Sequence, residues 1–320
     1  MVETSVCAVQ KEDVREKLAS FGQDNPKLPL ISHLERMDYF SSLVAGIANS
    51  FVGIFETGRS TPALKKGSPD IAGFDPLALA FACNLRRDTG EACWLLFLSS
   101  YFGRHPKHHW DLMEKVYLGP GMGDGWTWEN ASADPVAFAG WLVENQPELS
   151  RYGNMARAHK YVSFGSYKAM KTAGDIQTYI SWVINAGGHR ELFPASALSE
   201  GGSPSHIFDR LYAAMNMQLR CKKAITFNYL SLLGILGVAG IEPARPYLSD
   251  HLPSKLGANW LFGGNAVPKR RANELEPIVT ALAHHLELPF IIPVLRQAFA
   301  QIAAGSHAEA IQRFRWRHNR

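Results

Sequence analysis

The residues best suited to chemistry lie between Met217 and Gly264, where a basic turn, an apolar helix, a Gly/Pro connection and an acid follow one another. The acid, Asp250, stands just before a helix predicted to begin near Leu252, so its carboxylate could accept backbone N–H groups and stay ionised near the positive helix end. A carboxylate fixed there could face a deoxyribose carbon and stabilise the positive charge that develops when a glycosidic bond breaks. The alternative is that Asp250 only caps the helix, and one residue can do both.

Basic residues flank this acid in the sequence. We expect DNA or phosphate contacts from Arg220, Lys222, Lys223, Lys255, Lys269, Arg270 and Arg271. From His251 to Arg320, nine Lys and Arg stand against four acids, a net charge of +5, whereas the chain as a whole carries +4. Such a region supplies sequence-independent affinity because each neutralised phosphate releases counterions, although a solvated surface with a basic tail has the same composition. Lys222 or Lys223 could instead form a Schiff base with the sugar, which would give a bifunctional enzyme.

Aromatic and polar residues that could bind an unstacked base occur at several places in the chain; Asn154, His159 and Lys160 form a polar run between helices that could equally be ordinary loop. Two long irregular stretches, Leu118–Ala131 and Phe193–Ser205, also stand out. The predicted base and sugar pocket consists of Tyr101, Trp126, Trp128, Asn154, His159, Lys160 and Tyr161. Long loops in compact domains are often functional, and the first stretch could be an aromatic lid beside the pocket. Its glycine run lacks a preceding strand, so it favours a surface turn over a phosphate-binding loop.

No metal or cofactor is expected from the sequence. The nearest candidate set is His105, His108 and His109, but Pro106 breaks the helical frame and no Cys or acid stands at matching spacing. The four cysteines form no CxxC pair, so we expect them to be reduced and mostly buried.

Apolar residues at three- and four-residue spacing predict an all-α protein. The predicted helices cover 33–55, 76–87, 90–102, 107–117, 134–144, 175–186, 206–217, 222–236, 252–262, 272–286, 289–303 and 307–316. Asp134 ahead of Pro135 and Ser205 ahead of His206 are typical helix caps. We expect an N-terminal arm or short helix over 1–32, a helical domain over 33–304 that could divide into lobes 33–200 and 205–304, and a basic C-terminal helix or tail over 305–320.

Composition sets the class of protein. With 46% hydrophobic and 19% charged residues, the chain can bury a large core, which excludes a disordered protein. The longest apolar run, Phe40–Phe55, contains serines and an asparagine, which argues against a membrane span, and the first residues lack the apolar segment of a signal peptide. We therefore expect a cytoplasmic location.

Two family resemblances follow from these residues. A basic turn before an Asp-containing helix start resembles the helix-hairpin-helix DNA glycosylase superfamily, although Leu219–Lys223 replaces the Leu-Pro-Gly-Val-Gly hairpin and the interval to Asp250 is longer. From about residue 75, the chain resembles more closely the alpha-glutamyl/putrescinyl thymine pyrophosphorylase clade 3 family. The matching stretches are Trp94–Leu98, Tyr101–Gly103, Trp126–Trp128, Tyr152–Asn154, His159–Tyr161, Tyr179–Trp182, Phe227–Leu230 and Ile241–Pro243 through to Leu261–Gly264.

These resemblances imply a compact multi-helix, DNA-glycosylase-like fold and double-stranded DNA with modified bases as the partner, without an obligatory protein partner. They imply a glycosylase that flips and excises a hypermodified pyrimidine of phage DNA, such as glucosylated hydroxymethylcytosine, and leaves abasic sites in anti-phage defence. The family name implies instead a transferase or pyrophosphorylase acting on modified thymine. Ser249–His251 differs from the Gly-Pro run of many members, and the acid there favours hydrolysis. A third hypothesis, from the basic segment, is a DNA-binding module without chemistry.

Overall fold

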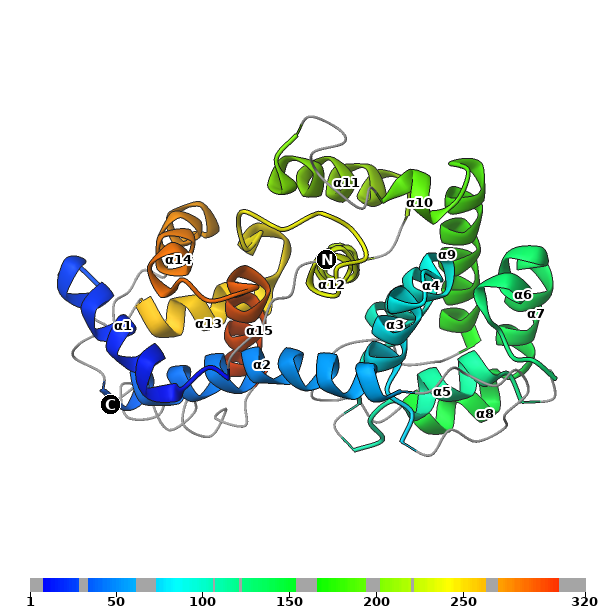
Figure 1. The fold of residues 1–320 in the computed structure, drawn as a ribbon, viewed down its shortest axis with the longest axis horizontal. Coiled ribbons are helices and arrows are strands. Elements are labelled where there is room, and N and C mark those ends of the chain that lie inside the picture. The colour runs from blue at the N-terminus through cyan, green and yellow to red at the C-terminus, as the bar shows by residue number, and fades with distance from the viewer. Residues whose placement is uncertain are drawn as a thin grey trace. The chain divides into compact units, whose positions relative to one another are not determined.

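The computed structural model describes residues 8–28, 34–61, 73–105, 107–120, 123–153, 166–193, 202–219, 222–262 and 270–304. Regular structure within these ranges is helical (Figure 1). The only extended pairing in them is a single bridge between His105 and His109. The all-α prediction is therefore confirmed. The chain forms two compact units: unit 1 is Met1–Gly53 with Pro243–Arg320, and unit 2 is Ile54–Glu242.

Unit 1 joins helices from both ends of the chain. Its elements are α1 (Lys11–Asp24), the first part of α2 (Leu34–Ser60), η2 (Leu248–Asp250), α13 (Leu252–Phe262), α14 (Ala272–Leu286) and α15 (Ile291–Ala304). Helix α13 packs against α15 and α14, and α1 packs against α14. At Gly257 the backbones of α13 and α15 come so close that an added Cβ would lie 2.0 Å from the Phe299 carbonyl oxygen. Only glycine allows this approach.

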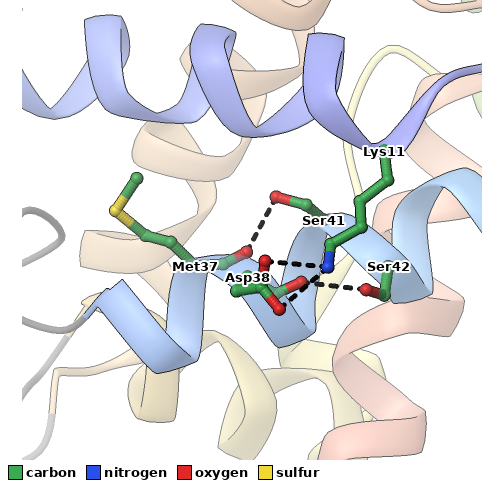
Figure 2. A network of polar contacts seen from close by, with 5 residues as sticks. All are labelled: Lys11, Met37, Asp38, Ser41 and Ser42. Atoms are coloured by element: carbon green, nitrogen blue, oxygen red, sulfur yellow. Dashed lines mark hydrogen bonds and ion pairs between the residues drawn. The ribbon is translucent and has the colours of Figure 1, made fainter.

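The N-terminal segment is fixed to the body of unit 1 by polar contacts. Figure 2 shows Lys11 of α1 beside Asp38 of α2, with its Nζ 2.8 and 2.9 Å from the two carboxylate oxygens. The hydrogen bond from Lys11 lowers the pKa of Asp38. In the same view, the Ser41 and Ser42 hydroxyls donate to the Met37 and Asp38 carbonyls within α2. Of the two alternatives for this segment, an arm or a short helix, the structure has a helix at Lys11–Asp24 that belongs to unit 1.

Helix α2 is long and apolar enough to cross a membrane by length and composition. Core helices of soluble proteins meet the same criteria. Within unit 1, Phe40 of α2 stacks on Phe299 at 5.0 Å and Arg36 donates to the Trp260 carbonyl at 2.9 Å. The apolar side of α2 is therefore used in packing.

Unit 2 is built around α4 (Thr89–Phe102), whose residues from Ala92 onwards are all buried. The other elements are the end of α2, α3 (Pro76–Leu85), α5 (Asp111–Leu118), α6 (Trp128–Ala133), α7 (Pro135–Glu144), α8 (Gln146–Gly153), α9 (Ser166–Asn185), α10 (His189–Leu192), α11 (Pro204–Gln218) and α12 (Lys223–Ile235). Phe97 of α4 lies nearly parallel to Tyr179 of α9, with ring centroids 3.6 Å apart. The Tyr179 hydroxyl lies 2.7 Å from that of Tyr229 and 2.8 Å from His189 Nε2. This aromatic cluster forms the core of unit 2.

Several boundaries differ from those expected. Asp134 caps α7 as predicted, but α11 is capped by Ser203, not Ser205, because Pro204 occupies the first helical position. Helix α9 begins at Ser166 instead of Asp175. The expected lobe boundary lay near residues 200–205, whereas the units divide near 53 and 242. The expected helix 307–316 lies outside the described residues.

Candidate functional site

The loop that leads to Asp250 is held by side chains of α14 and α15. The Arg296 guanidinium donates to the Pro246 carbonyl at 2.9 Å, and Glu276 accepts a hydrogen bond from the Tyr247 backbone N–H at 3.0 Å. Tyr247 adopts a left-handed conformation with φ of +49°. A bulky residue is strained there and persists only where the surroundings hold it, which is common at functional sites. The backbone before Asp250 is thus held by two side-chain hydrogen bonds and is locally strained.

Asp250 is the last residue of η2, and its side chain is half-buried at the start of α13. Its backbone N–H donates to the Tyr247 carbonyl at 3.1 Å. The first hydrogen bond of α13 runs from Lys255 N–H to the carbonyl of His251, so His251 occupies the N-cap position. Asp250 stands one residue before the cap where the sequence suggested the cap itself, and it remains near the positive end of the helix.

A buried hydrogen-bond chain fixes His251 beside this acid. The Ser254 hydroxyl donates to the Arg296 carbonyl at 2.6 Å, so the 2.6 Å contact between Ser254 Oγ and His251 Nδ1 requires His251 to donate through Nδ1. Burial, reinforced by the charge of Arg296, lowers the pKa of His251 to about 4. The imidazole is therefore neutral at pH 7, and it holds the helix start in place without adding charge next to Asp250.

Three of the basic residues predicted to contact DNA lie in the same unit as Asp250. The Asn259 side chain donates to the carbonyls of Lys255 and Arg270 at 3.1 and 3.0 Å, and it accepts from the Arg270 N–H at 2.9 Å. The Asn259 side-chain amide thus joins the first turn of α13 to Arg270, which lies just before α14. Lys255 and Arg270 are half-buried and Arg271 is exposed. The cationic cluster of Lys255, Arg270 and Arg271 is therefore a feature of unit 1.

The remaining basic candidates are placed elsewhere. Lys222 and Lys223 are exposed at the start of α12, in unit 2. Arg220 and Lys269 lie outside the described residues. The structure accordingly assigns Asp250 and the two lysines to different units.

The aromatic candidates belong to unit 2 and differ in exposure. Trp126 is buried against Phe138, with ring centroids 5.0 Å apart, and Tyr101 is buried with its hydroxyl donating to Asp175 at 2.9 Å. Trp128 is half-buried, and its ring centroid lies 4.3 Å from that of His189. Of these three aromatic residues, Trp128 alone is not buried. Asn154, His159, Lys160 and Tyr161 lie outside the described residues.

Two carboxyl groups of unit 2, those of Glu91 and Asp175, are hydrogen-bonded to these aromatic residues. Neither acid was predicted from the sequence as a site residue. Glu91 accepts hydrogen bonds from the Tyr117 hydroxyl at 2.7 Å and from the Trp128 N–H at 2.8 Å; burial raises its pKa to about 7 against the opposing effect of these bonds. Asp175 binds Lys171 as well as Tyr101. The spacing of Lys171 and Asp175, four residues apart on a helix, was the available signal. Glu91 gave none, because its partners come from distant segments.

The histidine set offers no metal site among the described residues. His105 Nδ1 accepts the backbone N–H groups of Lys107 and His108 at 3.1 and 2.9 Å. This nitrogen of His105 is committed to a turn, and His108 Nδ1 lies 3.6 Å from the carboxylate of Asp111.

Comparison with known proteins identifies the family. The model of alpha-glutamyl/putrescinyl thymine pyrophosphorylase clade 3 matches residues 49–302. The chain belongs to this family. The match includes Asp250, the cationic cluster and the aromatics of unit 2, and the family name points to enzymes that act on modified pyrimidines of DNA. No curated protein and no solved structure matches the chain.

Proposed function

We propose that this member of the family is a DNA glycosylase that extrudes a hypermodified pyrimidine, such as glucosylated hydroxymethylcytosine, from double-stranded phage DNA. It then hydrolyses the N-glycosidic bond that joins this base to the deoxyribose. The product is an abasic site, and the reaction serves anti-phage defence in the cytoplasm. The observation that carries the proposal is the half-buried carboxylate of Asp250, on a strained and tethered loop, in the unit that also holds Lys255, Arg270 and Arg271.

The chemistry assigned to Asp250 follows from charge. Cleavage of the bond between base and sugar leaves positive charge on the sugar, and a fixed carboxylate stabilises that charge while it orients or deprotonates the attacking water. The neutral His251 adds no cation that would compete for this carboxylate. Water is the only co-reactant, so no cofactor is required.

Extrusion of the base costs free energy before the bond is cleaved. Unstacking and unpairing one nucleotide costs roughly a few kcal/mol, which phosphate contacts and stacking on protein aromatics must offset. Lys255, Arg270 and Arg271 are the proposed phosphate contacts in unit 1, and Lys222 and Lys223 are those in unit 2. Of the three described aromatic candidates, Trp128 is the one that is not buried, which favours it over Tyr101 and Trp126 as the stacking residue. A Schiff base through Lys222 or Lys223 would convert the enzyme into a lyase.

The proposal is tested with Asp250→Asn. We expect base release from glucosylated hydroxymethylcytosine DNA to fall at least about 100-fold, because the charge of the general base is lost, while binding of the same DNA persists. Free base is measured by mass spectrometry, and abasic sites by alkaline strand cleavage. Asp24→Asn is the matched control, since Asp24 is an exposed acid of unit 1 at the end of α1.

A transferase or pyrophosphorylase acting on modified thymine is the second candidate, favoured by the name of the family. The two functions give different products. If pyrophosphorylated thymine DNA and an amine donor yield a new base adduct while no substrate yields free base, the glycosylase proposal is wrong. Equal rates of base release for Asp250→Asn and the unaltered protein would remove Asp250 from the mechanism.

A further inference from the structure

An exposed apolar stripe runs along the first turns of α13. The side chains of Leu252 and Leu256 are 62% and 39% exposed, and a spacing of four residues places them on one face of the helix. Pro253 beside them is exposed as well. Trp260 continues the same face, but the guanidinium of Arg36 covers its ring at 5.2 Å. The solvent-exposed part of the stripe is therefore formed by Leu252, Pro253 and Leu256.

This stripe is close in sequence to the proposed catalytic acid and to one of the proposed phosphate contacts. Leu252 follows Asp250 by two residues, and Lys255 stands within the same turn. Arg270 is tied to that turn through Asn259. The nearby acids of α14 are engaged, because Glu276 accepts from the Tyr247 backbone and Glu274 accepts from that of Arg271. An apolar edge bordered by cations complements a polyanion with an apolar interior, and the duplex with its base stack is such a polyanion.

We propose that Leu252 and Leu256 form a wedge that enters the base stack of duplex DNA and occupies the space left by the extruded nucleotide. The inference rests on the proposed function and assigns residues to its extrusion step. Proteins that kink or open duplexes insert leucine, proline and similar side chains between base steps in this way. The rigid loop before α13 and the close packing at Gly257 hold the wedge, so the helix start does not yield when it meets stacked bases.

A protein partner fits this surface less well. Two leucines and a proline at one helix end are a small patch beside the roughly 800 Å² that a stable protein interface buries on each partner.

The test compares one modified oligonucleotide as a duplex and as a single strand. Leu252→Ala with Leu256→Ala should lower the rate of base release from the duplex at least about tenfold, since extrusion loses its wedge. The rate on the single strand, which has no stack to open, should stay within about twofold. Leu85→Ala is the matched control, because Leu85 is 57% exposed at the end of α3 and lies away from the proposed site residues in the sequence. Leu252→Met should retain the duplex rate. Equal losses on both substrates, or no loss on the duplex, would overturn the wedge.

A second readout needs no base release. With the Asp250→Asn protein bound, 2-aminopurine placed next to the target position should become more fluorescent as its neighbours unstack. The two alanine substitutions should abolish this rise, and Leu85→Ala should preserve it. If the unaltered protein releases no base from any DNA but shows the rise, the glycosylase proposal fails and the wedge stands. If it releases base without the rise, the wedge fails alone. A change from dimer to monomer in the alanine variant, with the rise intact, would assign the stripe to a second copy of the chain and overturn the wedge.

Discussion

At the scale of single residues, His251 links the candidate site to the stability of unit 1. Its folded-state pKa of about 4 lies below the ordinary value of 6.5, mainly because the imidazole is buried. At pH values between 4 and 6.5, His251 carries a proton in the unfolded chain but not in the folded protein. The contribution of His251 to the free energy of unfolding is therefore fully present above pH 6.5 and is lost as the pH falls toward 4.

We predict that His251→Gln flattens this dependence. From pH 7 to pH 5, the unaltered protein should lose about 2 kcal/mol of unfolding free energy through His251, and the variant should not show that loss. Urea unfolding at both pH values measures the difference, and His284→Gln, an exposed histidine of α14, serves as the control. If His251→Gln and His284→Gln keep the same pH dependence as the unaltered protein, His251 is not buried neutral in solution.

The sequence placed some of these residues correctly and could not place others. Asp250 was predicted to stand at a helix start because Ser-Asp before an apolar period is a local signal, and it lies one residue before the cap. The roles of Arg296 and Glu276 as tethers were not predictable, since their partners, Pro246 and Tyr247, lie about 30 to 50 residues away. Trp126 was expected in a pocket because it stands in a Gly-rich run, and its ring packs in the core.

At the scale of elements, glycine decides how closely helices approach. Gly257 brings α13 against α15, and this contact sets the position of the helix that carries the wedge and follows Asp250. The apolar period predicted α13 and α14 with the bounds they have. It missed the short α8 and the first half of α9, where polar residues interrupt the pattern.

We predict that Gly257→Ala destabilises the protein by about 1–3 kcal/mol, because its Cβ would overlap the Phe299 carbonyl oxygen and separate the two helices. Gly46→Ala is the matched control, as Gly46 is an exposed residue inside α2 with no heavy atom within 4 Å of its added Cβ. That substitution should leave stability unchanged or raise it by up to about 1 kcal/mol. Thermal unfolding of both variants checks the pair, and similar melting temperatures would contradict the packing argument.

At the scale of the whole molecule, the chain is folded from non-contiguous segments. Unit 1 combines the first 53 residues with those from 243 onward, an arrangement that periodicity along the sequence cannot reveal, because it depends on which helices meet. The proposed DNA contacts are correspondingly shared, with Lys255, Arg270 and Arg271 in unit 1 and Lys222 and Lys223 in unit 2. Each group can be tested by itself.

The salt dependence of DNA binding tests the group in unit 1. Each lost phosphate contact should reduce the slope of log affinity against log salt by about 0.9, so Lys255→Ala with Arg270→Ala should reduce it by about 2. The fold should survive, since Asn259 binds only the backbone of these two residues. Arg104→Ala with Lys107→Ala removes the same charge from two exposed residues of unit 2 that are not among the candidate DNA contacts, and it should leave the slope unchanged. If both double variants shift the slope equally, binding responds to net charge alone and the cationic cluster is not a phosphate site. Lys222→Ala with Lys223→Ala, measured in the same titration, decides whether unit 2 supplies contacts of its own.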